Sequence, residues 1–130
     1  MSAIDFEALR AAAQAALPHA YAPYSGFRVA AALLSEDGRV FVGVNVENAS
    51  YGLTLCAERS AVAAAVSAGA RRFVAIVVVC SGDAPPSPCG ACRQVLCELL
   101  PAFAVRCHGQ DGSLLESTTD ALLPDRFVLR

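Results

Sequence analysis

The chain has 130 residues and a formal net charge of −2, and hydrophobic residues make up 55% of it. This length fits a single domain, residues 1–130, whose core needs no disulfide, and the even spread of charge excludes the basic stripe typical of a protein that grips DNA or RNA. No apolar run approaches the roughly 18 residues of a membrane helix, and residues 1–6 lack the features of a signal peptide, so we expect a cytoplasmic protein that binds a small molecule.

The first part of the chain is expected to form a helix and then a hairpin. Apolar residues at near-helical spacing predict an amphipathic helix over residues 4–17, which ends at Pro18. Residues 21–27 are rich in Pro, Gly, Ser and aromatic residues and should form a shaped loop. Residues 29–34 and 39–46 are strand-like, and the Glu36-Asp37-Gly38 turn between them makes a hairpin.

The second part alternates helices and strands. Residues 56–68 are Ala-rich and predict a helix that closes at Gly69. Residues 73–80 form an apolar, β-branched run typical of a buried strand. The remaining predicted elements are a loop over 81–88, a helix over 89–100, a short strand over 103–107 and one helical turn over 118–122. A hairpin followed by strand-helix crossovers favours an α/β fold, a mixed sheet with helices on both faces.

Two short segments contain residues suited to metal chemistry, and six cysteines without a secretion signal favour metal or redox chemistry over disulfides. Cys89 and Cys92 lie three residues apart at the start of one predicted helix, and Cys56 opens another. Helix N-termini stabilise negative charge and therefore favour thiolates. Three thiolates converging from two helix ends would hold Zn²⁺ and leave its fourth position open, as catalytic zinc sites do.

Glu58 follows Cys56 by two residues. At the first turn of a helix both side chains can reach past the helix end, one onto the metal and the other beside it. A carboxylate in that place would take a proton from the water that the metal activates. We expect Arg59 and Arg93 to offset the negative charge of the site by donating to the sulfurs.

Two other classes of protein also use a Cys-x-x-Cys pair. A non-enzymatic zinc-binding module would close the site with a fourth protein ligand, from Cys80, Cys97 or a histidine. A redox dithiol protein would use the pair alone, and would leave Cys56 and Glu58 without a role. The combination of all three cysteines with the glutamate instead agrees with the zinc-deaminase signature in its three-cysteine form.

Five stretches of the chain form a specific set: residues 21–27 (YAPYSGF), 43–52 (GVNVENASYG), 56–59 (CAER), 88–94 (PCGACRQ) and 123–127 (LPDRF). Through them nearly the whole chain resembles the cytidine deaminase family, in its small homotetrameric branch. Cysteine rather than histidine at position 56 is typical of the small tetrameric enzymes. The resemblance implies a three-layer α/β/α fold with a mixed five-stranded sheet, one Zn²⁺ per subunit and a homotetramer.

The resemblance also implies how a nucleoside would bind. Asn45 and Glu47, with Val46 between them, would bind the ribose, and an amide and a carboxylate suit hydroxyl groups because they donate and accept hydrogen bonds. Phe27 would stack on the pyrimidine ring. Ala57 would offer backbone polar groups to the base, and its small side chain would let the ring approach the metal.

Two further residues would act across a subunit boundary, since the resemblance implies that Tyr51 and Phe127 complete a neighbouring subunit's site. The chain departs from the family at Ala30, where glycine is usual. If Ala30 faced the pocket, its extra methyl group would change affinity. The tail after Gly112 is also less family-like.

By this resemblance the protein is a hydrolase of pyrimidine salvage, which converts cytidine and 2′-deoxycytidine to uridine and 2′-deoxyuridine plus ammonia. Water would add at C4, and Glu58 would carry its proton to ring N3 and then to the leaving amine. A blasticidin-type antibiotic deaminase shares the metal motif but would not need residues 47–52, which favour a nucleoside. The balanced charge argues against a polynucleotide substrate.

Overall fold

One mixed sheet organises the chain, of which the computed structural model describes residues 3–129. The ends of the predicted domain, residues 1–2 and 130, lie outside the described part. The strands are β1 (Val29–Ser35), β2 (Val40–Val44), β3 (Phe73–Cys80), β4 (Ala104–His108) and β5 (Leu114–Thr118), in the order β2-β1-β3-β4-β5. Within this sheet β3 and β4 run parallel, and the other neighbours are antiparallel.

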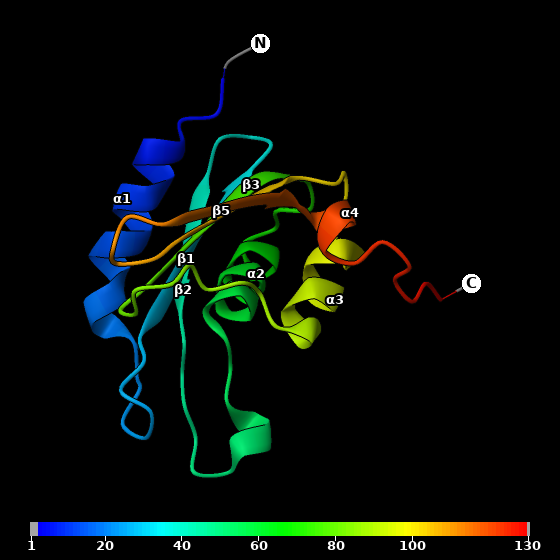
Figure 1. Ribbon diagram of the computed structural model, residues 1–130. Helices are drawn as coiled ribbons and strands as arrows, with labels where there is room; N and C mark the ends of the chain where they lie inside the picture. Colours follow the sequence, from blue (N-terminus) through cyan, green and yellow to red (C-terminus); the bar gives the residue numbers. More distant parts are fainter. Residues whose placement is uncertain (1–2, 130) are drawn as a thin grey trace.

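Helices cover both faces of the sheet (Figure 1). Helix α1 (Phe6–Ala16) lies on one face, and α2 (Ala57–Ser67), α3 (Gly90–Glu98) and the single turn α4 (Thr119–Leu122) lie on the other. The predicted three-layer α/β fold is confirmed. Short 3₁₀ turns occur at Leu17–His19 and Tyr51–Leu53, and none of the helices in residues 3–129 has the length and apolar character needed to cross a membrane.

Strand β1 supplies small side chains to both layers. Ala31 and Leu33 pack toward α2 and α3, whereas Ala30 and Ala32 pack toward α1. Side chains alternate between the faces of a strand, and alanine lets a helix approach closely. Ala30, which stands where the resemblance implies a glycine, therefore lies on the α1 face. Its side chain is completely buried there and points away from the predicted pocket.

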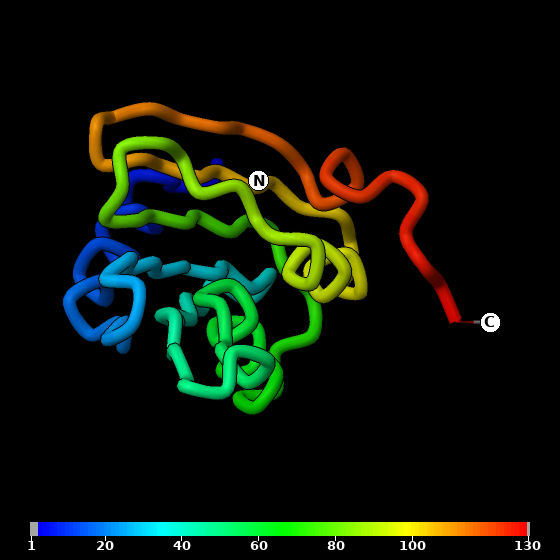
Figure 2. The backbone as a smooth tube through the Cα atoms, turned by 60° about the horizontal axis from the view of Figure 1, so that its bottom comes forward, coloured from blue at the N-terminus to red at the C-terminus, as the bar shows by residue number. Residues whose placement is uncertain are grey.

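The C-terminal part differs most from the elements predicted in chain order. Strand β5 was not among them, because its residues alternate between half-buried and exposed and offer little apolar pattern. It pairs with β4 after a turn at Gly112, whose φ is +88°. Beyond α4 the chain runs away from the sheet (Figures 1 and 2).

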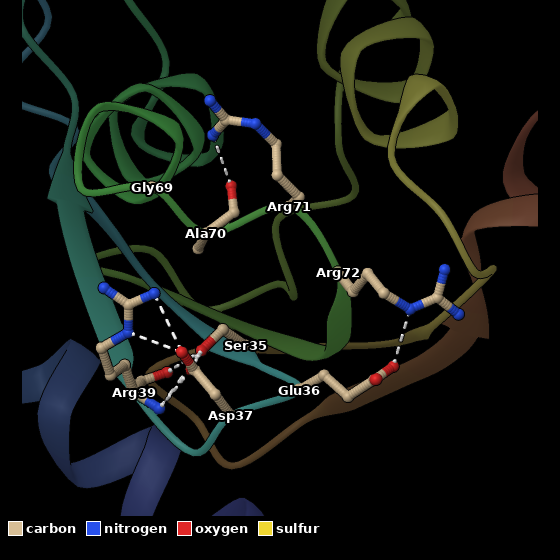
Figure 3. A pocket seen from close by; sticks show the side chains of 8 residues that line it. All are labelled: Ser35, Glu36, Asp37, Arg39, Gly69, Ala70, Arg71 and Arg72. Atoms are coloured by element: carbon tan, nitrogen blue, oxygen red, sulfur yellow. Dashed lines mark hydrogen bonds and ion pairs between the residues drawn. The ribbon is translucent and has the colours of Figure 1, made fainter.

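The predicted hairpin turn is confirmed and is held by ion pairs (Figure 3). Gly38 has φ +92°, a conformation that favours glycine. Hydrogen bonds from Arg39 and Ser35 lower the pKa of Asp37 to about 2. Arg39 also donates to the carbonyl of Ala68 over 3.0 Å, which ties the hairpin to the end of α2.

Gly43 of β2 allows α2 to lie directly against the sheet. A Cβ at this position would lie 2.7 Å from the carbonyl oxygen of Ala57 and 2.7 Å from Cβ of Ser60. We expect Gly43→Ala to destabilise the fold by about 2 kcal/mol, because helix backbone cannot yield as a side chain can. The melting temperature should fall by about 5–10 °C.

Thermal melts followed by circular dichroism would measure this change. Gly52→Ala is the matched control, because its Cβ would meet no atom within 4 Å. Equal melting temperatures for the two variants would contradict the expected close contact between β2 and α2.

Candidate active site

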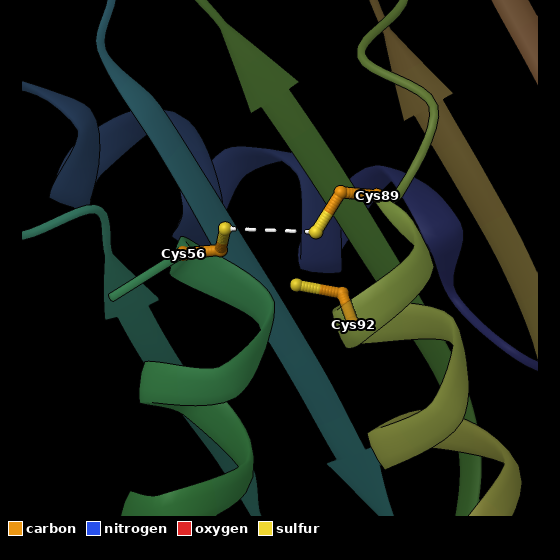
Figure 4. A group of neighbouring side chains, drawn as sticks. All are labelled: Cys56, Cys89 and Cys92. Atoms are coloured by element: carbon orange, nitrogen blue, oxygen red, sulfur yellow. Dashed lines mark hydrogen bonds between the residues drawn. The ribbon is translucent and has the colours of Figure 1, made fainter. Parts of the chain in front are cut away.

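The N-termini of two helices bring three cysteines together (Figure 4). Cys56 is the N-cap of α2, Cys89 is the N-cap of α3, and Cys92 lies in the first turn of α3. Their three Sγ atoms lie within 4.8 Å of one another, and the Sγ atoms of Cys56 and Cys89 are 3.9 Å apart. Both helices begin one residue later than predicted, because each cysteine caps its helix instead of starting it.

This thiol cluster fits a zinc ion. Tetrahedral coordination with Zn–S bonds of about 2.3 Å places sulfurs about 3.8 Å apart, close to the 3.9 Å between the Sγ atoms of Cys56 and Cys89. Within residues 3–129 no other Cys, His, Asp or Glu joins the cluster. The thiols of Cys80 and Cys97 donate instead to backbone carbonyls, of Gly82 and Thr119 respectively. Three ligands and no fourth agree with an open, catalytic type of site and count against a closed structural one.

The thiols of the cluster ionise unequally. A hydrogen bond from Cys92, supported by Arg59 and Cys89, lowers the pKa of Cys56 to about 5 against the opposing effect of burial. The same pairing with Cys56, together with burial, raises the pKa of Cys92. Nη2 of Arg59 lies 3.5 Å from Sγ of Cys56. A thiolate is therefore available at Cys56 to capture a cation.

Arg93 does not share this role, contrary to the expectation that it donates to a sulfur. Its Nε donates to the carbonyl of Pro88 over 2.7 Å, Nη1 to the carbonyl of Leu122 over 3.0 Å, and Nη2 to Oγ of Ser87 over 2.8 Å. Arg93 therefore fixes the loop before Cys89 onto α4. Sequence could not show this, because two of its partners are backbone carbonyls, which residue types do not reveal, and that of Leu122 lies 29 residues along the chain.

Glu58 is in the first turn of α2 and is only 5% exposed. Burial raises the pKa of its carboxyl group, and the negative charge of Cys56 adds to the rise, while its own backbone N–H and Arg59 act in the opposite direction. A carboxyl group with a raised pKa holds and releases a proton closer to neutral pH than an exposed one. This chemistry is what a proton carrier in a hydrolytic site requires.

Glu58 and two of the thiols line a cavity of about 210 Å³. The cavity also contains Phe27, Asn45 and Ala57 from the set of predicted substrate-binding residues. Its other lining residues, which sequence reasoning did not single out, are Val29, Thr54, Leu55, Pro86 and Ser87. Most of these residues lie close in sequence to the CAER or PCGACRQ motif, and this was the one signal in the sequence that could have identified them as part of the site. An adjoining hollow of about 380 Å³ shares Thr54 with this cavity and is lined by Glu47 and Tyr51. The other larger hollows contain none of the three thiols.

Asn45 and Glu47 are held firmly by the loop that precedes β1. Oδ1 of Asn45 accepts from the backbone N–H of Val29 over 2.9 Å, and Nδ2 donates to the carbonyl of Phe27 over 2.8 Å. Oε1 of Glu47 accepts from the N–H groups of Tyr24 and Ser25, and its Oε2 accepts from the hydroxyl of Ser25. Hydrogen bonds to the carboxylate lower the pKa of Glu47, that from the Ser25 hydroxyl most, so Glu47 stays ionised.

Four predicted substrate-binding residues lie outside this cavity, and one of them is Glu47. Val46 makes a backbone bridge to Leu55 and its side chain is exposed. Tyr51 is 81% exposed and Phe127 is 70% exposed. Phe127 lies on the C-terminal tail, where its carbonyl accepts from Nε2 of Gln94 over 3.2 Å. Within one subunit these side chains do not reach the cavity.

Comparisons with known proteins converge on one family. The family model for the cytidine and deoxycytidylate deaminase zinc-binding region matches residues 4–105. A cytidine deaminase of Halalkalibacterium halodurans is 54% identical over 110 residues, which cover 84% of this chain and 83% of that protein. The crystal structure of cytidine deaminase from Burkholderia pseudomallei superposes with a TM-score of 0.90 at 50% identity, covering 95% of this chain and 100% of that one. That of the Mycobacterium tuberculosis enzyme gives 0.84 at 43% identity, with 98% and 100% covered.

Proposed function

The chain belongs to the cytidine and deoxycytidylate deaminase family, and we propose that it deaminates cytidine and 2′-deoxycytidine to uridine and 2′-deoxyuridine, with release of ammonia, in pyrimidine salvage. The observation that carries this proposal is a single cavity lined by two thiols of the cluster, the buried Glu58, Phe27 and Asn45. It combines groups that activate water with groups that suit a base and a sugar.

Cys56, Cys89 and Cys92 are the residues that would hold the metal, one Zn²⁺ per subunit. When bound, the ion supplies a water molecule whose lowered pKa makes it a nucleophile at neutral pH. The open cluster geometry supports this assignment, as does the matched zinc-binding region of the family.

Glu58 moves the protons. Its carboxylate takes a proton from the water that adds to C4 of the pyrimidine, and delivers it to ring N3. A second proton then passes through Glu58 to the amino group, which leaves as ammonia while the C4 carbonyl forms. Burial suits this role because a buried carboxyl group is less strongly biased toward the ionised form.

The sugar-binding groups have hydrogen-bonding capacity to spare. One lone pair on Oδ1 and one N–H on Nδ2 of Asn45 remain after its bonds to Val29 and Phe27. Glu47 accepts three hydrogen bonds from the loop, and a carboxylate offers about four acceptor positions. Each residue can therefore pair with a ribose hydroxyl without breaking the loop.

Ser25 links the sugar and base sites, because its hydroxyl donates to Glu47 and accepts from the N–H of Phe27 over 3.0 Å. We expect Ser25→Ala to raise KM for cytidine about tenfold with a smaller change in kcat, since a hydrogen bond to a charged group contributes about 1.5 kcal/mol. Steady-state kinetics would measure both constants. Ser117→Ala on β5 is the control, and an unchanged KM for Ser25→Ala would contradict the linking role.

We also propose a homotetrameric enzyme of the cytoplasm. Exposure of Tyr51 and Phe127, with Leu53 and Leu129 similarly exposed, leaves apolar surface that a neighbouring subunit would cover. Tyr51 and Phe127 would then complete the neighbour's site. The free thiols of Cys80, Cys97 and Cys107 suit a reducing compartment. Light scattering during size exclusion would give the number of subunits, and a monomer with full activity would refute the assembly.

The function is tested on a small panel of substrates with zinc measured in the same sample. Cytidine, 2′-deoxycytidine, deoxycytidylate and blasticidin S would each be followed by ultraviolet absorbance. We expect turnover of the two nucleosides and about one zinc per chain. Turnover of blasticidin S alone would indicate an antibiotic deaminase, and zinc binding without any turnover would indicate a non-enzymatic module.

A further inference from the structure

A second cavity, of about 310 Å³, lies on the α1 face of the sheet, away from the thiol cluster. It opens at the carboxyl ends of the two parallel strands, where Ser81 follows β3 and His108 ends β4. Arg10 and Gln14 of α1 also line it, as does Gln110. In open α/β sheets, ligands bind outside the carboxyl ends of parallel strands, and this cavity occupies that place.

Arg10 places a positively charged guanidinium with an unpaired nitrogen at the cavity. Its Nε is shut off from solvent and has no hydrogen-bond partner among residues 3–129. The arginines at the hairpin end of the molecule differ, because Arg39 binds Asp37 and Arg72 binds Glu36 (Figure 3). No Asp or Glu lines the Arg10 cavity. An unpaired buried polar atom lowers the stability of the fold. A bound anion would supply the hydrogen-bond partner that this guanidinium lacks.

His108 places a second donor in the same cavity. It pairs in register with Val79, on the α1 face, and is 8% exposed. Burial, reinforced by Arg10, lowers the pKa of its imidazole, so the ring is neutral and offers one N–H. Arg106 acts in the same direction, whereas Glu7 of α1 and Glu116 of β5 oppose it.

We propose that this cavity binds a small oxyanion of the phosphate class, held by the guanidinium of Arg10, the imidazole of His108 and the side-chain amides of Gln14 and Gln110. A planar guanidinium matches two oxygens of a phosphate at once, and the remaining groups donate to the other oxygens. The site is separate from the catalytic cavity, with which it shares no lining residue. The two cavities lie near each other. Ser81 lines this one, and its Oγ accepts from the backbone N–H of Arg28, which is next to Phe27 of the catalytic cavity.

Nuclear magnetic resonance of the two histidines tests the proposal in the zinc-loaded protein. His108 lines the cavity, whereas His19 is exposed elsewhere and serves as an internal control. Titration with inorganic phosphate at constant ionic strength should shift the His108 ring signals saturably and raise its pKa, because a bound anion favours the charged imidazole. The His19 signals should stay in place. Equal responses to phosphate and chloride would overturn the proposal.

Variants assign the effect to Arg10. Arg10→Gln should raise the apparent Kd for phosphate about tenfold or more. Arg10→Lys keeps the charge but not the planar guanidinium, and should give an intermediate Kd. Arg72→Gln removes the same charge at the other end of the molecule and should leave the Kd unchanged. An unchanged Kd in both Arg10 variants would overturn the proposal. Methyl phosphate that binds as well as phosphate would identify a phosphate ester as ligand, and weaker binding would identify the free ion.

Discussion

Glu58→Gln is expected to lower the turnover of cytidine by a factor on the order of 10²–10⁴, while the protein keeps its zinc and its fold. Glutamine has nearly the same shape but cannot accept or release the protons that the reaction moves. Because Glu58 is 5% exposed, the variant also removes a buried carboxylate, so the melting temperature should not fall. Uridine formation, zinc content and thermal melts together give these three readouts.

The matched control is Glu116→Gln, an exposed residue of β5 that pairs with Arg106 over 3.7 Å. It changes the net charge equally and should leave turnover unaffected. Near-normal uridine production by Glu58→Gln would remove Glu58 from the mechanism. Loss of zinc from the same variant would show instead that the carboxylate supports the metal site.

Cys89→Ser is expected to lose zinc and, with it, measurable deamination. Serine stays neutral at the pH where a thiolate forms and is a weak zinc ligand, so only two thiolates remain. Cys89 is exposed, unlike the completely buried Cys92, and the substitution therefore tests ligation without disturbing the core. Zinc that binds the folded state stabilises it, so a chelator should lower the melting temperature of the parent protein but not that of the variant.

Cys97→Ser is the control for this prediction. Its thiol donates to the carbonyl of Thr119 over 3.0 Å, a bond that a serine hydroxyl can also make. This variant should keep full zinc content and the parent's response to the chelator. Full metal content in Cys89→Ser at unchanged stability would count against Cys89 as a ligand.

Local sequence patterns were sufficient where the chemistry is local. The Cys-x-x-Cys spacing placed Cys89 and Cys92 in one helical turn, and capping by Cys56 and Cys89 moved the helix starts by one residue only. The hairpin was predictable from the Glu36-Asp37-Gly38 turn between two strand-like runs, and Gly38 adopts the positive φ that such a turn requires. Strand β5 was not, because an exposed edge strand carries little apolar periodicity.

The sequence by itself determined which residues could hold a metal or carry a proton, and the alternation of helices and strands, since each depends on residue type and short spacing. Only the tertiary structure decided which residues from distant segments come into contact. It turned Arg93 toward the carbonyl of Leu122 and Ala30 toward α1, and it left Phe127 outside the cavity of its own subunit. It also placed Arg10 and His108 at one cavity. Each of these depends on contacts between segments far apart in the chain, which packing of the sheet establishes and local pattern does not encode.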